Sequence, residues 1–241
     1  MTYCVGLLLE AGCVLLSDTR TNAGLDNISS YRKMFTFEKP GERAIVLLTA
    51  GSLSVTQTTI ARLNDGILHP DEGKKPSILE AQTMLEVAEI VGATLAEATT
   101  EVGEKMSRMK QSATATILVA GQRKGGAMRL FLLYPEGNFI EATHDTPFLQ
   151  IGEHKYGKPI LDRVVKRQTT LEDARKAVLL SMDSTLRSNL SVGMPLDLCV
   201  IREGDCKVSQ QERIEAGNEK FAAMSQAWSD ALRDAFKRIS I

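Results

Sequence analysis

The order of strand-like and helix-like segments constrains the fold of this chain more than any other feature. Short apolar runs between turn residues fill residues 3–50, and two segments with helical periodicity follow them. Further apolar runs cover residues 113–142, and helical periodicity returns after residue 158. Two strand blocks alternating with two helix blocks favour an α/β fold of two mainly antiparallel sheets covered by helices. Periodicity alone leaves open whether the sheets pack face to face.

Apolar spacing and turn residues give the expected bounds of the main segments. A continuous apolar run at residues 44–48 suits a central strand that is covered on both faces. One helix is expected from Gly51 to about Leu68, and a longer one from Pro76. Later strands are expected at residues 113–120, 128–134, 138–142, 196–201 and 206–208, and later helices near residue 158, at 171–185 and at about 212–238.

Composition is consistent with a single domain spanning residues 1–241, with the last helix used in packing or assembly. The 43% of hydrophobic residues are enough to fill a sizeable core, and the net charge of −1 implies no nucleic-acid or membrane partner. Neither a basic region nor a long apolar stretch opens the chain, so a cytoplasmic location is expected. The four cysteines lack CxxC spacing and the three histidines are scattered. We therefore expect no disulfide framework, no metal and no cofactor.

Thr2 directly follows Met1, so removal of Met1 would make this threonine the N-terminal residue. A hydroxyl is a poor nucleophile at neutral pH, but a threonine's own α-amino group, with an ordinary pKa near ~8, lies within proton-transfer reach of its Oγ. One residue would then be both nucleophile and base. Many chains begin with Met and Thr by chance, so this pair of residues does not establish catalysis.

Two charged residues are expected close to Thr2. The first two apolar runs are separated by Glu10, Ala11 and Gly12, which indicates a hairpin and places Asp18 near Thr2. Lys33 begins the next strand, and a lysine beside the Thr2 hydroxyl would lower the pKa of that hydroxyl. A carboxylate would hold the lysine in place. The competing interpretation is that these are ordinary surface charges at strand ends.

Several motifs recur here in a set order and spacing: Thr2, Val5-Gly6, Ser17-Asp18-Thr19-Arg20, Lys33-Met34-Phe35 and Leu48-Thr49-Ala50-Gly51. They resemble the N-terminal half of proteasome β-type subunits and of the bacterial HslV peptidase. Three longer motifs cover more of the chain: Met1-Thr2-Tyr3-Cys4-Val5-Gly6, Ser17-Asp18-Thr19-Arg20-Thr21-Asn22-Ala23-Gly24 and Ile151-Gly152-Glu153-His154-Lys155-Tyr156-Gly157-Lys158-Pro159-Ile160-Leu161-Asp162. Through these, nearly the whole chain resembles more closely the bacterial Anbu (ancestral β subunit) family.

The resemblance implies a four-layer α-β-β-α sandwich, the fold of the N-terminal-nucleophile hydrolases. It implies that Thr2 is the nucleophile, Asp18 its orienting acid and Lys33 the charge-stabilising amine. Gly51 lies where a strand enters a helix, so its N–H is a candidate oxyanion donor; the alternative is that this glycine only permits a tight turn.

Other site residues also follow from the resemblance. Ser191 aligns with a serine that supports the proteasome N-terminus, whereas Ser188 stands where an aspartate is usual. Asn189 and Ser191 are therefore both candidates to hydrogen-bond the Thr2 amine. The resemblance places the substrate pocket at Thr21, Tyr31, Thr49 and Leu53.

Three further residues have competing interpretations. Glu153 stands near the position where the family usually has a Gly-Ser-Gly turn. Its carboxylate either contributes local charge to the site or is simply solvated, and the sequence favours neither interpretation. For Arg20 we favour a structural ion pair with Asp18 over a substrate clamp. Cys4, inside the first strand, is disfavoured as an alternative nucleophile.

Together these observations predict a threonine-type N-terminal-nucleophile amide hydrolase, most simply a self-compartmentalising peptidase. The alternatives are an amide hydrolase that acts on a small or conjugated substrate, and a non-catalytic assembling scaffold with a vestigial site. A homo-oligomer is expected, as a ring or an open spiral with the Thr2 sites facing an enclosed space. The resemblance favours the spiral, and the sequence leaves a partner unfoldase open.

Overall fold

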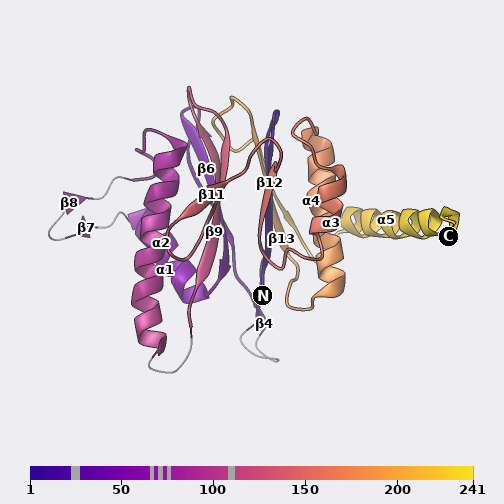
Figure 1. Cartoon of the computed structure of the whole chain (residues 1–241), viewed down its shortest axis with the longest axis horizontal. Coiled ribbons are helices and arrows are strands. Elements are labelled where there is room, and N and C mark those ends of the chain that lie inside the picture. The colour runs from indigo at the N-terminus through magenta and orange to yellow at the C-terminus, as the bar shows by residue number, and fades with distance from the viewer. Residues whose placement is uncertain (23–27, 66–67, 70–72, 75–76, 108–111, 241) are drawn as a thin grey trace.

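Two five-stranded sheets lie face to face between two layers of helices in the computed structural model (Figure 1). The structure describes residues 1–22, 28–65, 68–69, 73–74, 77–107 and 112–240. Every strand pairing within this part of the chain is antiparallel. The expected α-β-β-α sandwich is confirmed.

The first sheet carries the N-terminus on its β1–β2 hairpin. Its spatial order is β12 (Phe148–Gly152), β1 (Tyr3–Leu9), β2 (Gly12–Asp18), β13 (Leu196–Arg202) and β14 (Gln210–Ile214). The helices α3 (Lys158–Val164) and α4 (Leu171–Ser188) cover its outer face (Figure 1). All seven residues of β1 and of β2 are buried, because one face of each strand meets the helices and the other meets the second sheet.

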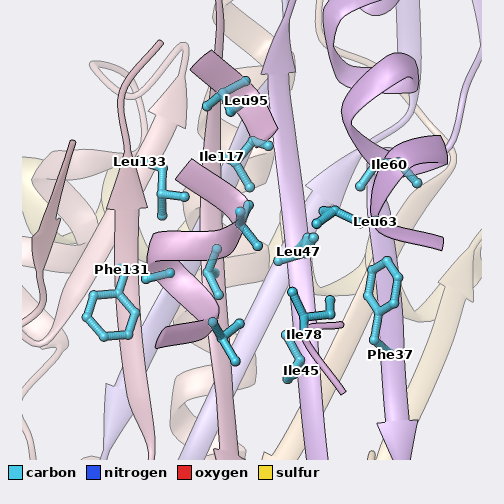
Figure 2. Close-up of a cluster of buried hydrophobic side chains, with 14 of the residues drawn as sticks. Phe37, Ile45, Leu47, Ile60, Leu63, Ile78, Leu95, Ile117, Phe131 and Leu133 are labelled. Carbon is cyan, nitrogen blue, oxygen red and sulfur yellow. The ribbon is translucent and has the colours of Figure 1, made fainter. Parts of the chain in front are cut away.

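The second sheet has the order β11 (Phe139–Glu141), β10 (Arg129–Leu133), β9 (Ala115–Arg123), β6 (Arg43–Gly51) and β5 (Met34–Lys39). The helices α1 (Leu53–Asp65) and α2 (Met84–Ser107) cover it, and Figure 2 shows Ile60 and Leu95 among the side chains packed there. β6 is the central strand expected at residues 44–48. Two short pairs complete the strands, β3 (Arg20–Asn22) with β4 (Ile28–Ser30) and β7 (Leu68–His69) with β8 (Gly73–Lys74).

Both helices of the first helical block differ from their expected bounds. α1 ends at Asp65, and Leu68 belongs to the short strand β7. α2 begins only at Met84, because Thr83 caps it: the Thr83 Oγ accepts the backbone N–H of Glu86 at 3.0 Å. The expected start at Pro76 lies outside the described residues.

The C-terminal region also differs from expectation. The strand expected at 206–208 is instead β14, Gln210–Ile214, and a helix start near residue 212 is therefore wrong. The last helix, α5 (Glu219–Arg238), begins after Asn218, whose Oδ1 accepts the backbone N–H of Phe221 at 2.9 Å. Strand β12 was not expected at all, although it forms the edge of the first sheet beside β1.

Helix α5 projects away from the body of the molecule (Figure 1). Ser225 is its one buried residue, and the Arg187 side chain of α4 donates a hydrogen bond to the Ser225 Oγ at 2.7 Å. Near its end Phe236 and Ile239 are 79% and 73% exposed. Within the described residues no helix has both the length and the apolar character of a membrane span.

Candidate functional site

The β1–β2 hairpin brings the N-terminus beside the end of the second strand. Cys4 lies opposite Ser17 in this ladder, so the residues before and after them approach one another at the sheet edge. The backbone N–H of Tyr3 donates a hydrogen bond to the Asp18 Oδ1 at 3.1 Å. The hairpin therefore places Asp18 next to Thr2.

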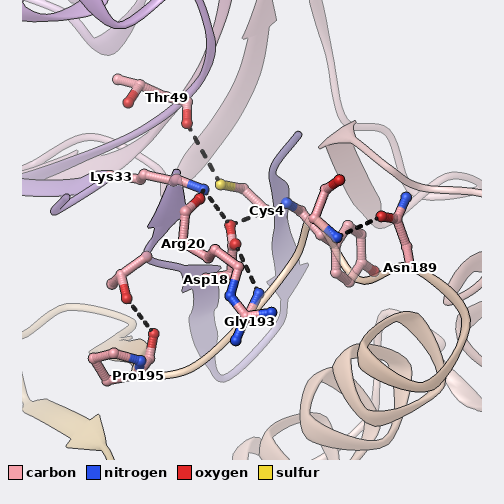
Figure 3. Close-up of polar contacts among 11 residues, drawn as sticks. Cys4, Asp18, Arg20, Lys33, Thr49, Asn189, Gly193 and Pro195 are labelled. Carbon is pink, nitrogen blue, oxygen red and sulfur yellow. Dashed lines mark hydrogen bonds and ion pairs between the residues drawn. The ribbon is translucent and has the colours of Figure 1, made fainter. Parts of the chain in front are cut away.

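A buried ion pair joins Asp18 to Lys33. The Lys33 Nζ lies 2.7 Å from the Asp18 Oδ1 and also donates to the carbonyl oxygen of Arg20 at 2.6 Å (Figure 3). The other carboxylate oxygen of Asp18 accepts the backbone N–H of Gly193 at 3.2 Å. Because Asp18 is fully buried and Lys33 nearly so, these contacts fix the position of the ammonium group.

Burial and hydrogen bonding act on Asp18 in opposite directions. Removal from water raises the pKa of its carboxyl above the usual range, because burial penalises the charged form. The Lys33 charge and hydrogen bond and the N–H groups of Tyr3 and Gly193 lower that pKa and offset part of the effect. Lys33 is therefore the group that contributes most to favouring the ionised carboxylate.

Thr2 and Lys33 line one cavity of about 130 Å³. Of the predicted site residues, the cavity brings together Thr2, Lys33, Gly51, Thr21, Thr49 and Leu53. Met1, Ala50 and Thr56 complete its lining. Asp18 reaches the cavity through its ion pair with Lys33. Tyr31 is 40% exposed and does not line the cavity, so the structure does not bring it together with the other three substrate-pocket residues.

The backbone of Thr2 is held on both sides. The N–H of Glu153 donates to the Thr2 carbonyl at 2.7 Å, and the next amide, that of Tyr3, donates to Asp18. Gly152 has a φ of +79°, and a Cβ on it would lie 1.9 Å from the Thr2 carbonyl oxygen. Only glycine permits this approach, and it brings the backbone amide of Glu153 to Thr2.

Gly51 ends β6 immediately before α1. Its φ is +108°, and a Cβ there would lie 2.4 Å from the carbonyl oxygen of Thr114. The turn therefore requires glycine for steric reasons, whatever its chemistry. Its backbone also faces the cavity that contains Thr2, so the expectation that its N–H holds an oxyanion stays a prediction.

The segment after α4 lies near the N-terminus but not in the cavity lining. The Asn189 Oδ1 accepts the backbone N–H of Ser191 at 2.9 Å (Figure 3), while Ser188 is exposed. Support of the Thr2 amine by Ser191 therefore stays a prediction. From the same segment, Gly193 contacts Asp18, a role that sequence spacing did not reveal because 175 positions separate the two residues.

The expected ion pair between Arg20 and Asp18 is wrong. The Arg20 Nη1 donates to the carbonyl oxygen of Leu190 at 2.9 Å, and Asp18 pairs with Lys33 instead. Gly193 allows this arrangement, because a Cβ on it would lie 2.1 Å from the Arg20 Nε. Arg20 thus holds the loop after α4 against β3.

Cys4 follows Thr2 by two residues, and its side chain packs in the apolar cluster between the two sheets. It is fully buried, and its Sγ lies 3.7 Å from the carbonyl oxygen of Thr49 (Figure 3). Burial raises the pKa of this thiol strongly, which keeps it protonated at neutral pH. In the described part of the chain no three His, Cys, Asp or Glu side chains gather as a metal site requires.

Comparison with known proteins places these features in a family. The family model described as proteasome subunit matches residues 2–201. The structure of the Gly-1 mutant of Anbu from Hyphomicrobium sp. strain MC1 is 48% identical, with a TM-score of 0.90 over 100% of this chain and 99% of that one. Anbu from Yersinia bercovieri is 41% identical, with a TM-score of 0.90 and coverage of 99% and 98%.

A third similar structure is the helical assembly of the Anbu complex from Pseudomonas aeruginosa. It is 42% identical, with a TM-score of 0.91 over 99% of this chain and 97% of that one. Among curated protein sequences none matches this chain.

Proposed function

The chain belongs to the Anbu family of proteasome-related proteins, and on that premise we propose that it is a threonine-type N-terminal-nucleophile amide hydrolase. One observation carries the proposal: Thr2 shares a cavity with an ammonium group that a buried carboxylate holds in place. A fixed positive charge beside a hydroxyl lowers the pKa of that hydroxyl and favours its attack on a carbonyl carbon.

The proposed reaction starts with removal of Met1, which frees the Thr2 amine. That amine takes the Oγ proton, directly or through one water, as Oγ attacks the amide carbonyl. The Gly51 N–H stabilises the oxyanion, and collapse of the tetrahedral intermediate expels the amine leaving group with the transferred proton. Water then attacks the resulting ester, with the Thr2 amine again as base, and releases the acid.

The substrate class is proposed from the lining of the cavity. Thr21, Thr49 and Leu53 offer two hydroxyls and one aliphatic side chain, which favours small or aliphatic groups over charged ones. A peptide is the first substrate class, with another amide on a small or conjugated molecule as the alternative. We place Ser191 or Asn189 as support for the free Thr2 amine and Tyr31 at the outer edge of the substrate site.

The protein is further proposed to act as a cytoplasmic homo-oligomer with a helical arrangement, as the P. aeruginosa relative is described. The exposed apolar end of α5 offers surface for such contacts. A stable monomer at micromolar concentration in light scattering after gel filtration would contradict this part. The competing function, a scaffold without activity, would be favoured if the protein kept Met1 in the cell, because Met1 blocks the Thr2 amine.

Intact mass and covalent labelling test the enzymatic function together. Protein from growing cells is expected to lack Met1 and to react with a hydroxyl-directed electrophile such as a peptide epoxyketone at one site per chain, Thr2. Thr2→Ala should abolish labelling with folding unchanged, and Thr2→Ser, which keeps the hydroxyl, should retain it. Full retention of Met1 would favour the scaffold. Labelling that survives Thr2→Ala would remove Thr2 from the mechanism.

A further inference from the structure

A second and larger cavity lies at the opposite end of β6 from the Thr2 site. It has a volume of about 580 Å³, and β6 runs from Arg43 in its wall to Gly51 in the wall of the Thr2 cavity. Nine residues of strand separate the two ends by roughly 27 Å, so the two cavities are distinct. The larger one is lined by Lys39, Glu42, Arg43, Leu79, Glu80, Gln82, Arg123 and Lys124.

Three cations form a row across the sheet at this cavity. Lys39 of β5 lies directly opposite Arg43 of β6, and Arg43 lies directly opposite Arg123 of β9. Residues paired in this way project from the same face of an antiparallel sheet, here the face that α2 covers. Like charges directly opposite one another disfavour folding, so stability of the sheet does not account for this row.

One cation of the row is fully occupied by the protein. The Arg43 guanidinium pairs with Glu42 at 2.9 Å and donates to the carbonyl oxygen of Ala81 at 2.8 Å. These contacts fix the segment before α2 as one wall of the cavity. Arg43 is therefore structural. Its charge still adds positive potential to the cavity, without any direct contact with a ligand.

The other cations at the cavity have no partner in the described part of the chain. Lys39, Arg123 and Lys124 make no ion pair or side-chain hydrogen bond there, and the Arg123 Nε is buried without an acceptor. A buried guanidinium N–H without an acceptor is disfavoured unless a ligand or water supplies one. Three uncommitted donors thus border one cavity, although Glu42 and Glu80 also stand in its wall.

We propose that this cavity binds a small phosphate-bearing anion. An arginine fork and two lysine ammonium groups match the oxygen atoms of a phosphate or diphosphate group. The volume is that of a small-molecule site, and the two carboxylates in the wall disfavour a long polyanion. Among the described residues, the lining contains no aromatic ring on which a nucleobase stacks, so recognition is of the phosphate groups themselves.

Isothermal titration calorimetry at constant ionic strength with inorganic pyrophosphate tests the proposal on the full-length protein. We expect saturable binding of one anion per chain. Arg123→Gln and the double variant Lys39→Ala/Lys124→Ala should each weaken it at least tenfold. Lys155→Ala removes an exposed lysine that does not line the cavity, and it should bind as the wild type does.

Three outcomes would overturn the proposal. One is the absence of saturable binding, and another is equal weakening in Lys155→Ala, which would show general electrostatic attraction. The third is tighter binding of a glutamate-rich peptide than of pyrophosphate, which would identify a peptide-docking surface instead. Should Arg123→Gln fail to fold by circular dichroism, the double variant decides, because both of its lysines are exposed.

Discussion

The two ends of strand β6 use positive charge in opposite ways. At the Gly51 end, Lys33 is buried, paired with Asp18 and hydrogen-bonded to a backbone carbonyl. At the Arg43 end, Lys39 and Lys124 are exposed and unpaired within the described part of the chain. The first charge is held in one position by contacts within the protein, whereas the others are free to contact the anion that we propose binds there.

This difference sets how much each cation matters for folding. Removing one member of a buried pair leaves an uncompensated charge out of water, which costs about 3–5 kcal/mol. Removing an exposed cation typically changes stability by less than about 0.5 kcal/mol. The residue type is the same in both places, so burial and partners decide its contribution.

The largest expected effect is that of Asp18→Ala. This change leaves the buried Lys33 ammonium without its carboxylate, and the N–H groups of Tyr3 and Gly193 lose their acceptor. The free energy of unfolding should fall by about 3–5 kcal/mol in urea denaturation at fixed protein concentration. Asp145→Ala is the matched control, since the Asp145 side chain is 99% exposed. A loss below about 1 kcal/mol for Asp18→Ala would remove the contrast between the two ends.

Lys33→Met tests the same ion pair through the pH dependence of stability. Burial already raises the pKa of Asp18, and the variant loses the main group that opposes this. Above its unfolded pKa near ~3.9, folded Asp18 keeps a proton that the unfolded chain has lost, so stability falls as pH rises toward the folded pKa.

The destabilisation caused by Lys33→Met should therefore grow between pH 4 and pH 8, by about 1.4 kcal/mol for each unit of pKa difference. Thermal unfolding across this range measures the effect. The double variant Asp18→Asn/Lys33→Met has no titrating carboxyl and should show no such slope. A single variant whose loss is independent of pH would mean that Asp18 stays charged without Lys33.

Cys4 provides a test of which nucleophile operates at this end. Burial raises the pKa of the Cys4 thiol, and it raises that of Cys199 to about 12. Thiolate forms only as pH approaches the pKa, so iodoacetamide at pH 8 should leave both cysteines unmodified in the native protein. Peptide mass mapping should find them alkylated after denaturation in urea. Rapid modification of native Cys4 would show that the first strand opens or that the thiol faces the cavity.

The smallest expected effect is that of Lys39→Ala at the other end. Loss of this exposed cation relieves repulsion across β5 and β6, so the free energy of unfolding should stay within about 0.5 kcal/mol of the wild type, or rise slightly at low salt. Chemical denaturation at two salt concentrations measures this, with Lys155→Ala as the control. A loss above about 1 kcal/mol would show that Lys39 is held by the fold as Lys33 is.

Local signals in the sequence predicted most of the scaffold. The hairpin that places Asp18 beside Thr2 follows from three turn residues, and β6 follows from its unbroken apolar run. The starts of α2 and α5 were also readable, because Thr83 and Asn218 are good N-cap residues at those positions. Apolar periodicity alone placed both starts too early, since it does not register caps.

Long-range hydrogen bonds of the backbone could not be predicted from the sequence. The Gly193 amide donates to Asp18 and the Glu153 amide donates to the Thr2 carbonyl, in both cases across a large distance in sequence. Every residue except proline has a backbone N–H, so the residue type does not indicate such contacts. Arg20 shows the same limit for side chains, since the arginine turns from Asp18 toward the Leu190 carbonyl. The need for a positive φ at Gly152 follows from the pairing of β12 with β1, which the sequence did not predict.

Under the proposed function, the chain that still carries Met1 would be a zymogen in which the backbone around Thr2 is already held in place on both sides. Neither the Glu153 amide on the Thr2 carbonyl nor the Asp18 contact with the following amide involves Met1. Cleavage of the Met1–Thr2 bond would then take Met1 out of the cavity and free the Thr2 amine, with no movement of strand β1. Under the proposed function, the onset of activity is timed by an aminopeptidase rather than by refolding.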